Sequence, residues 1–370
     1  MKKKNILSLC LSIAVTAAVL GAMVFAVGRP TEVLQTRPAA ENFAERFEMF
    51  LTNTLSDALE GVLAVEKVYW LKDEDPVAPE PNPACYGETD DPSSLGWLLE
   101  EAADILEGQE LLFSTETQIY PGSKVRYYLD DTIFAISWKH PVETCMFTFA
   151  EVKIKHASQF RRFLAGGEYA SGKFYTTSEM GDMVNAVLTS SGDYYTFRPF
   201  GITVYEGQVR RFGGMELDTC FINEEGDLLF AKQGTFETQE QAQAFVDENN
   251  VRFSLAFGPI LIQDGELSYP PYYPIGSVNR KYSRAALCQQ GQLHYVIVTA
   301  NMEDGYLLNM ITPDFARHLQ AMGIRNAYSI DGGQTAVIDL GGVMMNPVDF
   351  GWQREISDII YFATAVPDGN

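Results

Sequence analysis

The segment Asp331-Gly332-Gly333-Gln334-Thr335 combines residue types that could hold an anion beside a carboxylate. Glycine lets a ligand approach the backbone closely, and successive backbone N–H groups can form a concave anion site. Strands are predicted on both sides of this segment, at 326–330 and 335–340. An Asp-Gly turn between two strands is also typical of a β-hairpin, because these residues tolerate a positive φ. The local pattern alone favours the hairpin, with a binding turn as the alternative.

The charge of the chain excludes one class of partner. Its 370 residues include 27 Lys and Arg against 49 Asp and Glu, which gives a net charge of -22. Nucleic-acid binding depends on Lys and Arg that displace counterions from phosphates, so we expect no nucleic-acid partner. Against an acidic surface, any Arg that converges on a pocket would stand out, and Arg284 is the one to follow.

Histidine and cysteine give no sign of a metal or redox centre. None of the four histidines lies in an HExxH or other paired ligand pattern, so we expect neither a metal nor another cofactor. Four of the five cysteines lie beyond the N-terminal apolar segment, and no CxxC occurs. Two disulfides and buried free thiols both fit the sequence.

The first 29 residues predict export. Lys2, Lys3 and Lys4 precede an apolar run over 6–27. The length of the run favours a retained membrane anchor, because a cleaved signal peptide usually has a shorter apolar region of roughly 7 to 15 residues. Small residues at 24–26 leave cleavage open as the alternative. The positive-inside rule then places the rest of the chain outside the cytoplasm, either anchored or secreted.

The remaining elements predict an α+β fold, mostly antiparallel sheet with a few packed helices. Apolar spacing indicates helices at 43–62 and 95–106. Alternation indicates strands at 118–128, 132–139 and 145–154, and short strands separated by Gly or Asp turns follow from residue 185 onward. Two later helices are predicted to begin at caps, one at Thr238 with Gln241 and one at Thr312 with Pro313.

Several blocks of the C-terminal half resemble the phosphodiester glycosidase family. Residues 327–336 are similar to that family's motif around Asp-Gly-Gly. Further similar blocks follow the family's order at 191–195, 201–209, 257–265, 279–286 and 293–295. The resemblance covers roughly residues 140 to 365 and implies a glycosidase-like domain there. Together with the export signal, the sequence predicts three regions: a signal or anchor at 1–29, an N-terminal extracytoplasmic region at 30–135 and the glycosidase-like domain at 140–365.

The resemblance implies hydrolysis of a sugar-1-phosphodiester at the anomeric carbon. Such a site must hold phosphate, stabilise positive charge on the sugar and position water. The candidate catalytic residues are Asp331, Asp193 and Arg284, and we expect all three to line one cleft. The candidate substrate-binding residues are Gly332, Gly333, Gln334, Thr335, Ser191, Tyr195 and His294.

Two functions remain open at this point. The first is an extracytoplasmic glycosidase that acts on sugar-phosphate links in cell-envelope or exopolysaccharide glycans. The second is a non-catalytic glycan-binding or scaffolding protein of the cell surface with the same fold. The retained Asp193, Arg284 and Asp331 favour the enzyme.

Overall fold

The computed structural model describes residues 71–72, 75–213, 217–303 and 308–366. The chain divides into two compact units after Leu63, and every described residue belongs to the second, Ala64–Asn370. The signal or anchor predicted at 1–29 and the helix predicted at 43–62 lie outside the described residues. Within the described part of the chain, no helix combines the length and apolar character needed to cross a membrane.

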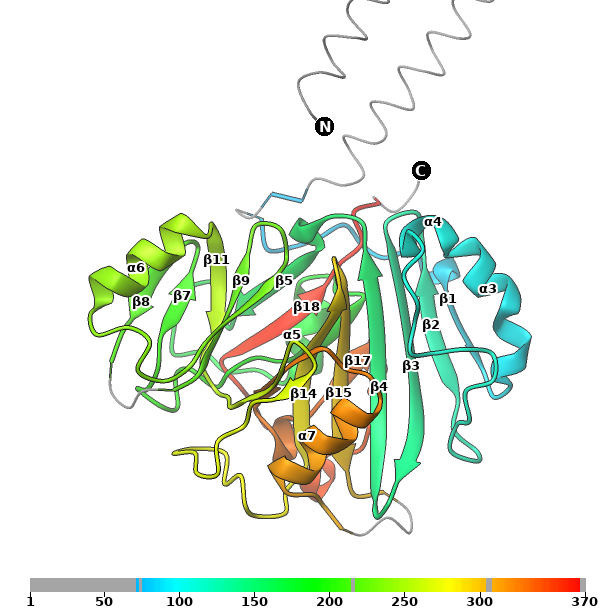
Figure 1. Ribbon diagram of the computed structural model, residues 1–370. Coiled ribbons are helices and arrows are strands. Elements are labelled where there is room, and N and C mark those ends of the chain that lie inside the picture. Colours follow the sequence, from blue (N-terminus) through cyan, green and yellow to red (C-terminus); the bar gives the residue numbers. More distant parts are fainter. Residues whose placement is uncertain (1–70, 73–74, 214–216, 304–307, 367–370) are drawn as a thin grey trace, which may run out of the picture. The chain divides into compact units, whose positions relative to one another are not determined.

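A nine-stranded antiparallel sheet is the largest element (Figure 1). In spatial order its strands are β1 (Tyr86–Thr89), β2 (Val125–Leu129), β3 (Ile133–Val142), β4 (Cys145–Ile154), β15 (His294–Asn301), β14 (Arg284–Gly291), β16 (Asn326–Ile330), β12 (Ile260–Gln263) and β13 (Glu266–Leu267). β4 matches the strand predicted at 145–154. β3 pairs with both β2 and β4, so the sheet continues across the predicted boundary between 30–135 and 140–365 without a break.

Two smaller antiparallel sheets complete the strands, and the prediction of a mostly antiparallel α+β fold is confirmed. The five-stranded sheet has the order β10 (Leu228–Ala231), β9 (Thr219–Asn223), β11 (Val251–Leu255), β7 (Thr203–Tyr205) and β8 (Gln208–Arg211). The four-stranded sheet has the order β17 (Ile338–Leu340), β6 (Leu188–Ser191), β18 (Asp358–Phe362) and β5 (Phe160–Leu164).

Short helices cover these sheets. The α-helices are α3 (Gly96–Glu101), α4 (Ala103–Leu106), α5 (Thr177–Met183), α6 (Gln239–Glu248) and α7 (Thr312–Ala321), and the 3₁₀ turns are η1 (Pro83–Cys85), η2 (Pro92–Leu95), η3 (Ala157–Gln159), η4 (Gly333–Thr335) and η5 (Asp349–Gly351). Thr238 caps α6 as predicted, because its hydroxyl accepts from the Gln241 N–H. The predicted cap of α7 is wrong: Thr312 is already helical, and Ile311 occupies the cap position without a side-chain hydrogen bond.

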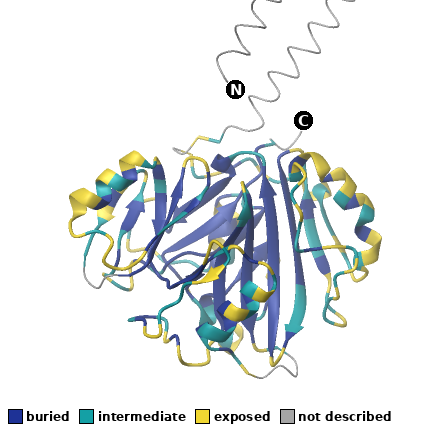
Figure 2. Cartoon of the chain, in the orientation of Figure 1, coloured by how far each residue is buried: buried dark blue, intermediate teal, exposed yellow. Residues whose placement is uncertain are grey.

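The core forms on both faces of the nine-stranded sheet, because side chains alternate along each strand. In β4, Ala150 and Val152 pack with residues of the two smaller sheets, whereas Phe147 and Phe149 pack on the other face with residues of α3, α4 and α7. Figure 2 shows the strands as largely buried and the outer helix surfaces as exposed. The four cysteines within the described range are free thiols, which settles the alternative that the sequence left open.

Candidate functional site

The Asp331 turn lies where the chain leaves one sheet for another. β16 pairs with β12 and β14 in the nine-stranded sheet, and β17 pairs with β6 in the four-stranded sheet. The hairpin expected from local sequence is therefore wrong, because the two flanking strands are not partners. The turn instead brings Asp331 to the junction between sheets, where the Ser191 hydroxyl at the end of β6 donates to its carbonyl at 3.4 Å.

The glycines of this turn serve close packing. A Cβ at Gly332 would collide with the Ser283 carbonyl, and Gly333 has a φ of 68°. The Gly333 N–H donates to that same carbonyl at 3.0 Å, and the Gly332 N–H donates to Oδ1 of Asp331 at 3.0 Å. The two N–H groups predicted to bind an anion therefore already have partners within the protein.

The Asp331 carboxylate has one free oxygen. The residue is 9% exposed, and its Oδ2 has no hydrogen-bond partner among the described residues. Oδ2 lies 3.8 Å from Nη2 of Arg354. Burial raises the pKa of the Asp331 carboxyl above its usual value, while the Thr335 hydroxyl and the charges of Arg354 and Arg198 act in the opposite direction.

Two arginines that the sequence did not single out face this carboxylate. The guanidinium carbons of Arg354 and Arg198 lie 4.6 Å and 5.6 Å from the centre of the Tyr194 ring. Nε of Arg354 is buried without a partner among the described residues, and no hydrogen bond or ion pair joins Arg198 to any of them. We call Asp331, Arg354, Arg198 and Tyr194 the Asp331 cluster. Both arginines come from irregular segments, where no periodic pattern marks them.

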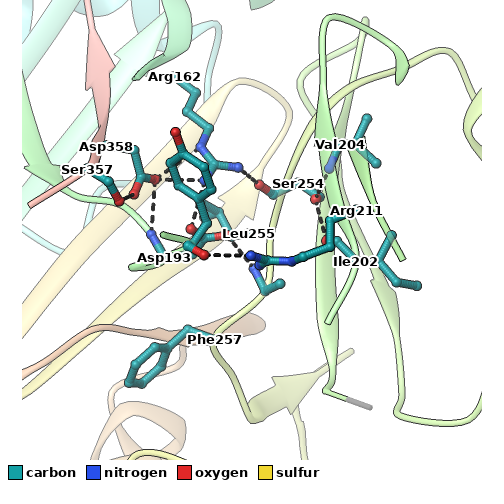
Figure 3. A network of polar contacts seen from close by, with 12 residues as sticks. Arg162, Asp193, Ile202, Val204, Arg211, Ser254, Leu255, Phe257, Ser357 and Asp358 are labelled. Atoms are coloured by element: carbon teal, nitrogen blue, oxygen red, sulfur yellow. Dashed lines mark hydrogen bonds and ion pairs between the residues drawn. The ribbon is translucent and has the colours of Figure 1, made fainter. Parts of the chain in front are cut away.

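Asp193 belongs to an adjoining buried network. Its Oδ1 lies 2.7 Å from Nη2 of Arg162, and its Oδ2 accepts from the Ala256 N–H at 2.9 Å. Arg162 also pairs with Asp358 at 2.8 Å and donates to the Ser254 carbonyl (Figure 3). We call Arg162, Asp193, Asp358 and Ser254 the Arg162 network. Both oxygens of Asp193 have partners and its side chain is fully enclosed, so the carboxylate is already bound within the protein.

The Arg162 network holds one positive and two negative groups away from water. Burial disfavours the charged form of Arg162, but Asp193 and Asp358 outweigh it and raise the pKa of Arg162. Burial also raises the pKa of Asp358, to about 6, against the lowering effect of Arg162. The sequence held a signal for this network: two adjacent arginines in a buried strand cannot both face solvent, because side chains alternate.

Arg284 lies on a different face of the nine-stranded sheet. Its even-numbered neighbours in β14, Ala286 and Cys288, pack in the cluster that includes α7. Its guanidinium donates to the carbonyls of Met310 and Gly276 at 3.0 and 2.8 Å, and also to those of Ser277 and Arg280. Burial lowers the pKa of Arg284 to about 10. Within the described residues no contact joins its side chain to Asp193 or Asp331, so the expected grouping of the three does not form through direct contact.

His294 lies at the opposite end of its strand from the turn. β14 and β15 are antiparallel, so Arg284 pairs with Ala300 at one end of the two strands and His294 pairs with Gly291 at the other. Nε2 of His294 is 2.8 Å from Oε1 of Glu151, and both side chains are buried. Glu151 in turn accepts from two backbone N–H groups of the 112–113 segment. These contacts give His294 a structural role.

The other predicted binding residues form hydrogen bonds to backbone groups within the protein. The Thr335 hydroxyl donates to the Gly332 carbonyl at 2.8 Å. The Gln334 amide donates to the Trp352 carbonyl at 3.4 Å. Tyr195 is buried, and its hydroxyl accepts from the Ala170 N–H at 3.0 Å. Of these, Gln334 is the one nearest to solvent.

A cavity of about 540 Å³ lies beside β5 and β11, lined among others by Arg161, Arg162 and Tyr205, so it borders the Arg162 network. No residue predicted for the site lines it. The Arg161 guanidinium donates hydrogen bonds to the carbonyls of Lys72 and Asp75. Among the described residues, no three His, Cys, Asp or Glu side chains converge to hold a metal ion.

Comparison with known proteins agrees with the predicted family. The sequence model for phosphodiester glycosidases matches residues 180–363. None of the curated proteins matches the sequence. Among solved structures, the zebrafish N-acetylglucosamine-1-phosphodiester α-N-acetylglucosaminidase catalytic domain, auto-inhibited by its pro-peptide, is 17% identical with a TM-score of 0.49, over 70% of this chain and 92% of that one. A hypothetical protein from Synechocystis is 14% identical with a TM-score of 0.45, over 67% of this chain and 64% of that one.

The match contains the Asp331 cluster and most of the Arg162 network, all of which except Arg162 itself fall within the matched residues. The resemblance predicted from the Asp-Gly-Gly block and its companions is thereby confirmed, and residues 180–363 of this chain belong to the phosphodiester glycosidase family.

Proposed function

We propose that this protein is an extracytoplasmic hydrolase that cleaves a sugar-1-phosphodiester in cell-envelope or exopolysaccharide glycans. The observation that carries the proposal is the pair of unpartnered buried atoms in the Asp331 cluster, Oδ2 of Asp331 and Nε of Arg354. Buried polar groups in proteins nearly always have hydrogen-bond partners, so a buried acceptor and a buried donor that lack them, on two residues whose Oδ2 and Nη2 atoms lie 3.8 Å apart, indicate a place for ligand or water. The lysines at 2–4 and the apolar run at 6–27 support an extracytoplasmic location.

The cluster has the groups that the reaction needs. Arg198 and Arg354 bind the phosphate oxygens, because guanidinium groups match phosphate in charge and geometry. Asp331 accepts a proton from water, and its charge stabilises the oxocarbenium-like sugar. The water oxygen bonds to the anomeric carbon as the bond from that carbon to the phosphate oxygen breaks. The bonding electron pair leaves with the phosphomonoester, which needs little protonation, and Asp331 returns its proton to solvent.

The test is release of free sugar from a panel of sugar-1-phosphodiesters. We expect turnover by the wild-type chain and a loss of about 100-fold or more in kcat for Asp331→Asn, because this substitution removes the base. Asp131→Asn is the matched control, since Asp131 is exposed in the turn between β2 and β3. Saturable binding without turnover on every member of the panel would instead support the glycan-binding alternative.

A further inference from the structure

Two aromatic side chains stand in solvent beside the Asp331 cluster. Phe350 is 86% exposed and Trp352 is 61% exposed. Phe350 also has a φ of 64°, a left-handed conformation that is costly for a bulky residue and concentrates at functional sites. No ring contact joins either side chain to another described residue. The two rings thus present large apolar surfaces to solvent.

The loop that carries these rings is fastened to the Asp331 turn. Oδ1 of Asp349 accepts from the Ser283 hydroxyl at 2.5 Å, and the Ser283 carbonyl accepts the Gly333 N–H. The Gln334 amide donates to the Trp352 carbonyl. These bonds fix the backbone on both sides of Phe350, so its ring and that of Trp352 are presented from a constrained loop.

Trp352 lies on the loop that leads to Arg354. Trp352 is extended, with φ -146° and ψ 144°. The side chain of Gln353 bonds to the Ser178 hydroxyl at 2.8 Å. Arg354, two positions further along the same loop, has its Nη2 3.8 Å from Oδ2 of Asp331, so Trp352 is tied by sequence to the Asp331 cluster.

A third exposed ring stacks on the tyrosine of the Asp331 cluster. Phe197 is 42% exposed and stacks on Tyr194 with ring centres 4.2 Å apart. Tyr194 is the ring over which Arg354 and Arg198 lie. Cationic groups for phosphate are therefore flanked by flat apolar surfaces from two loops.

We propose that the substrate is a chain of phosphodiester-linked sugars, and that the sugar next to the cleaved phosphate stacks on Trp352 and Phe350. This inference rests on the proposed function and specifies its substrate. A sugar ring has an apolar C–H face that covers an aromatic ring, whereas its hydroxyl edge stays in water. Exposed apolar surface joined to an anion site fits a ligand in which rings and phosphates alternate.

The experiment compares the affinity of the full chain for the methyl diester of N-acetylglucosamine 1-phosphate and for longer oligomers of the same repeat. Binding is followed by tryptophan fluorescence, using Asp331→Asn so that no ligand is consumed. We expect the dissociation constant to fall by about 10-fold or more from monomer to oligomer, equivalent to about 1.4 kcal/mol. Trp352→Ala and Phe350→Ala should each lose most of that gain; calorimetry replaces fluorescence for the Trp352 variant.

Trp97→Ala is the matched control, since Trp97 is 49% exposed on α3, and it should keep the gain with length. Equal affinity for monomer and oligomer, or no binding of either, would overturn the inference. So would a Trp352-dependent partition onto neutral phospholipid vesicles with no gain from oligomer length, which would identify a membrane contact. Oligomer binding that depends on Trp352 but gives no sugar release in the wild type would refute the proposed hydrolysis alone.

Discussion

At the scale of single residues, the charge around Asp331 decides when it can act as a base. Burial raises the pKa of Asp331, and Arg354 and Arg198 lower it. A base must be deprotonated, so activity should fall as pH drops through this pKa. Arg354→Ala removes a lowering influence, and we therefore expect the acidic limb of the pH profile of kcat/KM to move to higher pH.

Arg354→Lys is the control for that shift. It keeps the positive charge but loses the planar fork, so activity should fall while the acidic limb stays near its wild-type position. An acidic limb that does not move in Arg354→Ala, or that moves to lower pH, would show that Asp331 is not the titrating base.

The sequence identified Asp331 as a candidate site residue, but it did not identify the arginines that lie near it. The Asp-Gly-Gly block carried the resemblance to the phosphodiester glycosidase family, and the structure places it where the chain passes from one sheet to another. Arg198 and Arg354 gave no such signal, since the tertiary fold alone brings two loops 156 positions apart to one ring. Arg284 was the reverse case: its residue type suits phosphate, but the alternation of β14 directs it to backbone carbonyls on another face.

At the scale of elements, local patterns predicted strands better than strand partners. β4 followed from alternation within ten residues, and β16 has the bounds predicted for the strand before the Asp331 turn. The hairpin at Asp331 failed because pairing depends on contacts far along the chain, such as β17 with β6. The missing hairpin matters for function, because a hairpin would have held Asp331 within one sheet.

The contact between the Gly192 turn and β18 is the tightest element of the site. A Cβ at Gly192 would overlap Oδ2 of Asp358, which is already held by Arg162 and by the Asp193 N–H at 3.1 Å. We expect Gly192→Ala to reduce the free energy of unfolding by about 3 kcal/mol, because Asp358 must leave a buried ion pair. Urea denaturation measures this change.

Gly96→Ala provides the comparison for that substitution. A Cβ at Gly96 meets nothing within 4 Å, and the residue lies in α3 without a positive φ. Alanine there should be neutral or stabilising by up to about 1 kcal/mol. If Gly192→Ala and Gly96→Ala changed the free energy of unfolding equally, Asp358 would not be held in place against Gly192.

At the scale of the whole molecule, the Arg162 network joins two sheets. Arg162 and Asp358 belong to the four-stranded sheet, whereas Ser254 belongs to β11 of the five-stranded sheet. Loss of this network should therefore loosen the packing between the sheets as well as the site. We expect this loss to lower the free energy of global unfolding. Because Asp358 titrates, its contribution can be measured as a change of that free energy with pH.

The pKa of Asp358 is raised to about 6 from a usual 3.8, so the folded protein favours the protonated carboxyl. The stability from this group is complete below its unfolded pKa and is lost as pH rises through about 6. Asp358→Asn stays neutral at every pH, with its amide oxygen able to accept from Arg162 and its nitrogen able to donate to the Ser357 hydroxyl. The free energy of unfolding of the wild type, minus that of the variant, should therefore decrease between about pH 4 and pH 7 in urea denaturation. Carboxylates outside the Arg162 network are common to both proteins and cancel in this difference, and Asp131→Asn should give a constant difference over the same range. A constant difference for Asp358→Asn as well would contradict the raised pKa. It would mean that Arg162 keeps Asp358 ionised in the folded protein, with both carboxylates of the network paired to this one guanidinium.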